Sequence, residues 1–232
     1  MKTVSLAVSK KRGLSLGAIC LGGALALGCV LIAVFEAALT PAYAVKSLVK
    51  VALFAGLPLL ANRLSGGGHF QEMFRLNRKG LALTLALGLV VYGLIVGGYF
   101  LLRNRIDFSN IVPAQGGSGI DRGNLAWVAL YVCLGNCFLE EFFFRGAGYL
   151  ALSKVMNKKT AMVLSSACFS AYHIAIMAGW FAPLPFFGLL AALFVAGLFF
   201  CFLDDRAGSL LPSWGVHLFA NLAIYTVAFM LF

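Results

Sequence analysis

Residues 184–203 read LPFFGLLAALFVAGLFFCFL, a run of 20 residues without a charged side chain. A helix needs about 20 mostly apolar residues to cross a bilayer. Lipid offers no water to the backbone groups, so a run of this length should be a helix and not a strand. This stretch therefore predicts a transmembrane helix and decides the class of the fold.

Six more apolar runs bounded by charged residues accompany it. The seven predicted spans are 13–35, 45–61, 81–102, 124–152, 160–180, 184–203 and 213–232. The second is the weakest, because Lys46 and Lys50 lie in its first turns and Pro58 near its end, and part of it could lie in the membrane interface. In the third, Gly93 and Gly97 form a small-xxx-small pair, a pattern that lets membrane helices approach closely. The sequence predicts an all-α polytopic transmembrane helical bundle of about seven spans.

The composition of the whole chain supports this class. Of its 232 residues, 62% are apolar and 11% are charged, against about 45 to 50% and about 25% in soluble domains. The net charge of +10 raises nucleic acid as a partner. The basic residues, however, lie between the apolar runs, where they act as topology signals and phospholipid contacts. We therefore expect the lipid bilayer as the environment and no nucleic-acid partner.

The basic residues are distributed unevenly between the two sides of the predicted bundle. Residues 1–12, 62–80 and 153–159, together with Arg206, place 12 lysines and arginines on one side. The opposite side has five: Lys46, Lys50, Arg103, Arg105 and Arg122. The positive-inside rule then predicts a multi-pass protein of the cell (inner) membrane with a cytoplasmic amino terminus.

The first apolar run leaves an alternative open. A basic start, an apolar run and Ala42-Tyr43-Ala44 are also typical of a secretory signal with its cleavage site after Ala44. The run from Gly13 to Phe35 is longer than a signal core of about 7 to 15 residues, which favours a retained helix. Cleavage would leave the remaining topology unchanged.

Three charged residues lie together in the fourth predicted span. A charge near the bilayer centre costs about 2.5 to 3.5 kcal/mol, so each needs a partner or a function. Glu141 and Arg145 are four residues apart with the acid first, which predicts an ion pair on one helix face. Glu140 points about 100° away and must find a partner on another helix or stay protonated. Adjacent glutamates in a span favour a functional role for Glu140 over a purely structural one.

Two of the three histidines lie in later spans. His173 follows Phe169 by one turn, so the ring of Phe169 offers an apolar wall to the imidazole, and His217 shares a helix face with Asn221. The two histidines, Asn221 and Glu140 lie 11 to 15 residues from the nearest basic residue of the cytoplasmic side. At about 1.5 Å per residue their depths are about 16 to 22 Å, so the four side chains could meet in one layer.

A carboxylate, two imidazoles and a carboxamide in a water-accessible cavity are the groups that peptide hydrolysis by water requires. Glu140 would take a proton from water and later deliver it to the leaving amine. His173 would hold and orient the water. His217 and Asn221 would donate hydrogen bonds to the oxyanion of the tetrahedral intermediate.

In this order the residues resemble three motifs of the CPBP family, the glutamate intramembrane proteases that include the CAAX prenyl endopeptidases and their bacterial relatives. The motifs are Glu140-Glu141-x-x-x-Arg145, Phe169-x-x-x-His173 and His217-x-x-x-Asn221. The resemblance implies the same catalytic roles for Glu140, His173, His217 and Asn221, with Glu141, Arg145 and Phe169 as structural support and no cofactor. It divides the chain into an N-terminal transmembrane region of unassigned role, 1–123, and a catalytic transmembrane core, 124–232. By resemblance the substrate is a membrane-anchored peptide or the carboxyl-terminal tail of a protein.

Other classes of protein remain open. A zinc-dependent membrane protease of the CAAX type is the nearest, since two histidines and a glutamate can bind catalytic zinc. The sequence has no His-Glu-x-x-His helix, and Asn221 would be a poor ligand, so we expect no metal. A transporter could use the same buried polar cluster, and a bacteriocin-immunity protein could keep the fold without catalysis.

Overall fold

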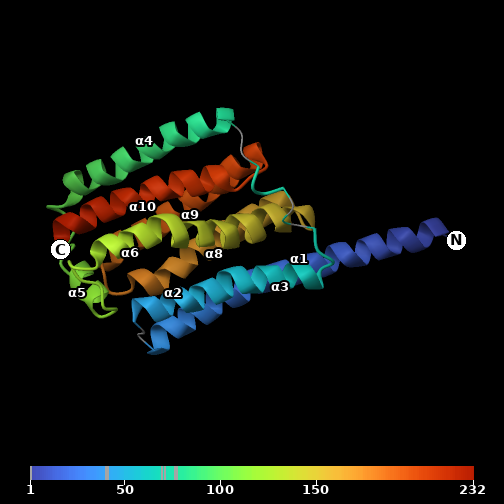
Figure 1. Cartoon of the computed structure of the whole chain (residues 1–232), viewed down its shortest axis with the longest axis horizontal. Helices are drawn as coiled ribbons and strands as arrows, with labels where there is room; N and C mark the ends of the chain where they lie inside the picture. Colours follow the sequence, from blue (N-terminus) through green and yellow to red (C-terminus); the bar gives the residue numbers. More distant parts are fainter. Residues whose placement is uncertain (1, 40–41, 69, 71, 76–77) are drawn as a thin grey trace.

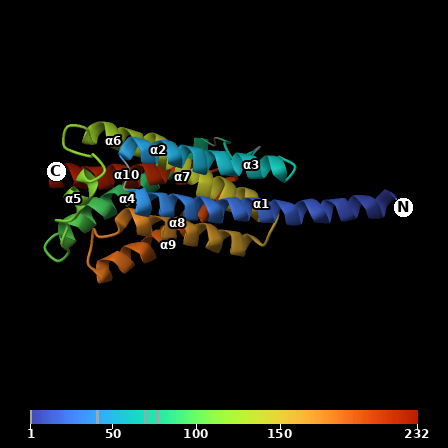
Figure 2. The same ribbon diagram turned by 90° about the horizontal axis from the view of Figure 1, so that it is seen from below.

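The computed structural model describes residues 2–39, 42–68, 70, 72–75 and 78–232, and the side chains of 16–36, 42–68, 70, 72–75 and 80–232. Within this part of the chain every regular element is helical, and seven helices are long and apolar enough to cross a membrane. The predicted fold class is therefore confirmed. The helices form an elongated bundle from which the amino-terminal part of α1 (Lys2–Leu39) projects, with the carboxyl terminus at the opposite end (Figures 1 and 2).

The predicted spans agree with the helices to within a few residues, apart from the start of α1. The apolar part of α1 is Leu16–Glu36. The later elements are α2 (Tyr43–Val51), the π-helical segment Ala52–Gly56 and α3 (Leu57–Leu64), then α4 (Arg78–Leu102), α5 (Ile111–Gly116), α8 (Lys158–Met177), α9 (Pro183–Ala207) and α10 (Leu211–Leu231). The second span, which was the weakest prediction, is one continuous helix of 22 residues from α2 to α3.

The fourth span departs from regular α-helix on both sides of the two glutamates. It consists of α6 (Leu125–Tyr131), the π-helical segment Val132–Asn136, α7 (Cys137–Glu141), the π-helical segment Phe142–Ala151 and a 3-10 turn over Leu152–Lys154. Wider turns of this kind inside α-helices are frequent at functional sites. The short α-helix that ends in the two glutamates lies between two of them.

Local signals fix the starts of the two helices that carry the histidines, α8 and α10, and the end of α9 between them. The side chain of Asn157 accepts hydrogen bonds from the backbone N–H groups of Lys159 and Thr160, at 3.0 and 3.3 Å, and so caps α8. Gly208 ends α9 with a φ of 63°, a left-handed conformation that glycine adopts without strain. Pro212 lies in the first turn of α10, where its missing N–H costs nothing.

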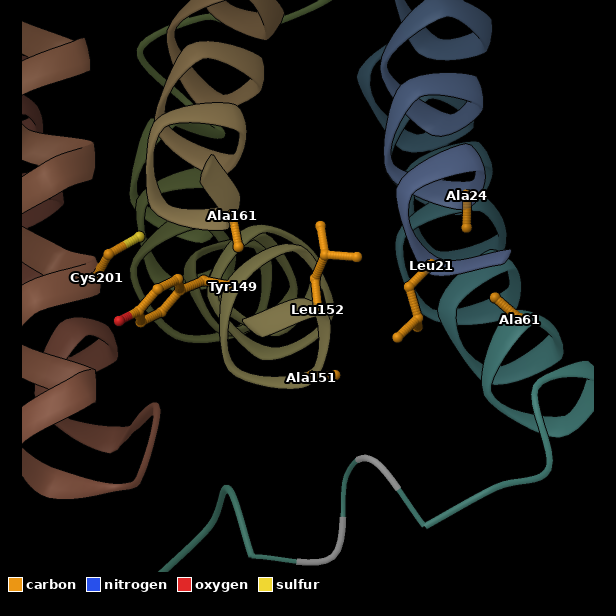
Figure 3. Packing of buried hydrophobic residues seen from close by; sticks show 8 residues of the cluster. All are labelled: Leu21, Ala24, Ala61, Tyr149, Ala151, Leu152, Ala161 and Cys201. Atoms are coloured by element: carbon orange, nitrogen blue, oxygen red, sulfur yellow. The ribbon is translucent and has the colours of Figure 1, made fainter. Parts of the chain in front are cut away.

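The core lies between α1, α3, the fourth span, α8 and α9. One buried cluster consists of Leu21, Ala24, Ala61, Tyr149, Ala151, Leu152, Ala161 and Cys201, and in it Leu21 and Leu152 point toward one another (Figure 3). A second cluster surrounds Phe54 of the second span, which stacks on Phe143 at 4.1 Å between ring centroids. The helix α1 contributes buried residues to both clusters. The helix α4 packs mainly on α10, at the edge of the bundle.

A close helix approach is found at a glycine outside the predicted pair. A Cβ added at Gly93 or Gly97 would meet no atom within 4 Å, so these two glycines face open space. A Cβ at Gly197 in α9 would instead lie 2.9 Å from the Cβ and 3.0 Å from the Cα of Ser166 in α8. The contact between α8 and α9 therefore requires a residue without a side chain at Gly197.

We expect Gly197→Val to destabilise the protein by about 1 to 3 kcal/mol, because the new side chain overpacks the contact between α8 and α9. The measurement is the midpoint of thermal unfolding of the detergent-solubilised protein, together with its abundance in membranes. Gly93→Val is the matched control, since it makes the same exchange inside a helix that has free space. Equal midpoints for the two variants would contradict the assigned approach.

Candidate active site

The ion pair predicted between Glu141 and Arg145 is present and fully buried. Arg145 Nη1 lies 3.2 Å from Glu141 Oε1, and neither side chain is exposed. The guanidinium also lies over the rings of Phe169 and Phe200, at 4.0 and 4.9 Å from their centroids. Contact with aromatic faces stabilises a cation that has lost its water. Arg145 is thus held by α8 and α9 as well as by its own helix.

Glu141 also binds His217 of α10. Its Oε1 lies 2.7 Å from Nδ1 of His217. An ionised carboxylate can only accept a hydrogen bond, so the imidazole donates its Nδ1–H and keeps Nε2 as the other ring nitrogen. This Nε2 lies 3.9 Å from Oε2 of Glu140, too far for a direct hydrogen bond. Glu141 therefore orients His217 so that its Nε2 faces Glu140.

The two oxygens of Glu140 have different surroundings. Oε1 accepts hydrogen bonds from Nδ2 of Asn136 at 2.8 Å and from the hydroxyl of Tyr172 at 3.2 Å. It also lies 3.7 Å from Nζ of Lys50. Oε2 faces His217. The partners expected on other helices thus come from α2, α8 and α10, and Asn136 adds one from the same span.

His173 lies half-buried on α8 beside this group. Its Nδ1 is 2.7 Å from the carbonyl oxygen of Phe169, which can only accept, so Nδ1 carries the hydrogen and Nε2 is the acceptor of the neutral ring. The imidazole packs edge-on against Phe169 at 4.7 Å and Tyr172 at 5.0 Å. The predicted wall is therefore present, and Phe169 also lies 5.9 Å from the ring of His217. The neighbour of His173, Tyr172, donates a hydrogen bond to Glu140.

Asn221 lies one turn beyond His217 on α10 and is buried. The spacing of four residues puts both on one helix face. No hydrogen bond between the described residues uses the amide group of Asn221. The structure thus links Glu140, Glu141, Arg145, Phe169, His173 and His217 through direct contacts, and it places Asn221 beside them through its helix.

Three partners of Glu140 escaped the sequence reasoning. Asn136 precedes Glu140 by four residues, the same spacing that predicts the ion pair of Glu141, so this contact could have been found. Tyr172 is the neighbour of His173, but the helical arrangement does not tell which of the two faces the glutamate. Lys50 was expected in the first turns of the second span, but no spacing within that span indicates that it meets Glu140.

Lys46 and Lys50 lie in the first turns of the second span, as predicted. Lys46 pairs with Glu36 of α1, and Lys50 pairs with Glu140, each at 3.7 Å. Both side chains are mostly buried within helix α2.

Asp204 is a further buried acid that the sequence reasoning missed. It lies near the end of α9, and its two oxygens accept hydrogen bonds from the backbone N–H of Ser213 at 3.0 Å and from the Ser213 hydroxyl at 2.7 Å. Ser213 is in the first turn of α10, where a negative charge is stabilised by the helix dipole. Asp204 therefore fixes the start of the helix that carries His217.

A zinc-dependent protease needs a group of side chains that can bind the metal. In the part of the chain with described side chains, no group of three or more His, Cys, Asp or Glu residues is arranged to hold a metal ion. Independence from metal stays a prediction, which a chelator tests directly.

Comparison with known proteins identifies the class of this part of the chain. Residues 122–223 match the family model described as type II CAAX prenyl endopeptidase Rce1-like. This stretch includes every residue predicted for the site, from Glu140 to Asn221. Comparisons with curated proteins and with solved structures each found no significant match.

The matched region therefore belongs to the CAAX protease-like family, also called CPBP, as its three motifs indicated. The family indicates an endopeptidase, and hence a peptide or protein substrate. Lys50 lies outside the matched region.

Arg145→Ala should reduce the amount of folded protein, because it leaves the buried carboxylate of Glu141 without its arginine. Breaking a buried pair costs about 3 to 5 kcal/mol. The measurement is abundance in membranes together with the unfolding midpoint in detergent. Arg103→Ala is the control, since Arg103 is exposed and also lies over a ring, that of Phe100 at 5.2 Å. Normal abundance of the Arg145 variant would contradict the role given to the pair.

Proposed function

We propose that the protein is an intramembrane endopeptidase of the glutamic type, which hydrolyses a peptide bond in a membrane-associated peptide or a carboxyl-terminal tail. One observation carries the proposal: in an apolar bundle, Oε2 of Glu140 faces Nε2 of His217 at 3.9 Å while Oε1 is occupied by other partners. A carboxylate with one free oxygen beside imidazole nitrogens is suited to taking a proton from water. The match to an endopeptidase family supports the same reaction.

In the proposed reaction Glu140 acts first as the base and then as the acid. Its Oε2 takes one proton of water while the water oxygen bonds to the carbonyl carbon of the substrate. The same proton then passes to the amide nitrogen as the C–N bond breaks, which yields a carboxylic acid and an amine. His173 presents Nε2 as an acceptor, so it would hold the second O–H of the water and orient its oxygen.

The oxyanion needs hydrogen-bond donors in place before the reaction. The amide group of Asn221 can donate directly. His217 uses its Nδ1–H for Glu141, so its Nε2 donates only when the ring is protonated. The proposed role of His217 therefore requires the imidazolium form, which Glu140 and Glu141 flank at 3.9 and 2.7 Å.

Glu140→Gln should abolish cleavage with little effect on folding, because the amide keeps the shape of the side chain but cannot take a proton. We expect a loss of about 100-fold or more, the usual contribution of a general base. The measurement compares membrane peptides from cells that carry active protein or the variant, and it identifies peptides that stay uncut. His173→Ala and His217→Ala should lose cleavage as well. Glu36→Gln, an acid in α1 paired with Lys46, is the control that should retain it.

Retained cleavage in the Glu140 variant would exclude the proposed base. If the protein is an immunity or binding protein without catalysis, the wild-type protein and the Glu140→Gln variant should have the same activity in cells, and no uncut peptide should accumulate in the variant. A strong zinc chelator should leave cleavage by the purified protein unchanged. Loss of activity that returns with added zinc would instead establish the zinc-dependent alternative.

For the orientation, we infer a multi-pass protein of the cell membrane whose amino terminus is cytoplasmic. With seven spans the carboxyl terminus would then lie on the opposite side. In bacterial cells, alkaline phosphatase fused after Phe232 should be active, and a fluorescent protein fused at the same point should be dark. The reverse pattern would overturn the inferred orientation.

A further inference from the structure

Lys50 brings a cation from the N-terminal half of the chain into the candidate site. Its Nζ lies 3.7 Å from Oε1 of Glu140 and 5.2 Å from the ring centroid of Tyr172, and its side chain is 12% exposed. A lysine within an apolar span is costly, and such residues usually have a function. The family match begins at residue 122, so this contact is not part of the matched motifs.

Three donors from different places converge on the same oxygen. Asn136 lies one turn before Glu140, Tyr172 comes from α8 and Lys50 from α2, and all three approach Oε1. A carboxylate oxygen has about two lone-pair positions, so the hydrogen bonds from Asn136 and Tyr172 fill Oε1, and Lys50 adds its charge at 3.7 Å, beyond hydrogen-bond distance. Oε2 is the oxygen that remains for water.

Stability alone does not account for the lysine. A buried ion pair adds little net stability, because desolvation of both charges offsets their attraction, and an apolar side chain of similar volume often serves as well. A methionine at position 50 could pack against Tyr172 without these costs. The ion pair does, however, determine the charge and the direction of the one carboxylate that the proposed reaction uses.

We propose that Lys50, together with Tyr172 and Asn136, is a positioning residue that binds Oε1 of Glu140, keeps the carboxylate ionised and leaves Oε2 as the atom that takes the proton from water. The inference rests on the proposed function. It also gives the second span a part in the site. The role of Lys50 is electrostatic, so it should depend on charge at position 50 and show in the dependence of catalysis on pH.

The charged and titratable groups around Glu140 determine in which direction the pH dependence of catalysis should shift. They are Lys50 and Tyr43 from the second span, Tyr172 and His173 from α8, His217 from α10, and Glu141 with Arg145 on the same span. Lys50 places its ammonium 3.7 Å from Glu140. Its removal makes the ionised carboxylate less favourable, so the acid limb of kcat moves to higher pH.

The experiment uses the full chain in lipid nanodiscs and a fluorogenic peptide whose prenylated cysteine is followed by three residues. The variants are Lys50→Met, which removes the charge, and Lys50→Arg, which restores it. Lys46→Met is the matched control: Lys46 lies one turn earlier on the same helix and pairs with Glu36 at the same distance of 3.7 Å. For Lys50→Met we expect an acid limb shifted upward by about one pH unit or more, with KM unchanged. Lys50→Arg and Lys46→Met should keep the wild-type profile.

The outcomes separate this inference from the proposed function. If the wild-type protein cleaves the peptide and the Glu140→Gln variant does not, an unchanged kcat profile in Lys50→Met overturns the role of Lys50 alone. Equal shifts in Lys50→Met and Lys46→Met would also overturn it, because they would reflect helix packing. Cleavage that survives in the Glu140→Gln variant would instead overturn the proposed base.

A second measurement needs no substrate. The infrared difference between the wild-type protein and Glu140→Gln isolates the carboxyl band of Glu140. We expect the pH at which this band changes from protonated to ionised to be higher with Met at position 50 than with Lys or Arg. An unchanged midpoint in Lys50→Met would refute the inference even if that variant were inactive for another reason.

Discussion

The site depends on one constraint: a carboxylate inside an apolar bundle must have its charge compensated within the protein. The structure meets this constraint differently for each of three buried acids. Glu140 has the ammonium of Lys50, Glu141 has the guanidinium of Arg145, and Asp204 has the amino-terminal turn of α10 through Ser213. Two of these interactions connect separate spans. Glu140 pairs with Lys50 of α2, and Asp204 of α9 accepts a hydrogen bond from Ser213 of α10. The groups that balance charge therefore also fix how the helices that carry the site lie against one another.

The same constraint gives the adjacent glutamates separate tasks. Glu141 is occupied by Arg145 at 3.2 Å and His217 at 2.7 Å, so it is best suited to holding an imidazole in one tautomer. Glu140, turned toward other helices, has one oxygen engaged and the other facing the histidine. Both histidines direct Nδ1 to an acceptor, which leaves Nε2 as the nitrogen available for chemistry. In the proposed reaction, His217 can therefore donate a hydrogen bond to the oxyanion only when its Nε2 is protonated.

The sequence predicted what depends on a single helix and missed what depends on how helices meet. Spans follow from apolar length, and the pair of Glu141 and Arg145 follows from a spacing of four, so both could be derived from the order of residues alone. The partners of Glu140 on α2 and α8 required the relative rotation and depth of three helices, which no spacing within one segment contains. The glycines show the same limit. Gly93 and Gly97 have the expected spacing but face open space, whereas Gly197, without a glycine partner one turn away, lies against Ser166.

The boundary drawn near residue 123 separates the family motifs from the rest of the chain, but it does not separate the site from its surroundings. Phe54 of the second span stacks on Phe143 and lies 5.3 Å from the ring of Tyr172, so this span forms a wall next to the glutamates. Lys50 lies one turn before Phe54, and its ammonium lies over the ring of Tyr172 and beside Glu140. In apolar surroundings an ammonium 3.7 Å from a carboxylate acts with little screening. Within residues 122–223, the ion-pair partner of Glu140 among the described side chains is His217, at 3.9 Å and only when its ring is protonated. A fragment restricted to the matched region would retain the three motifs yet lack the lysine that lies beside Glu140, so in the proposed reaction the second span contributes to the electrostatics of the site.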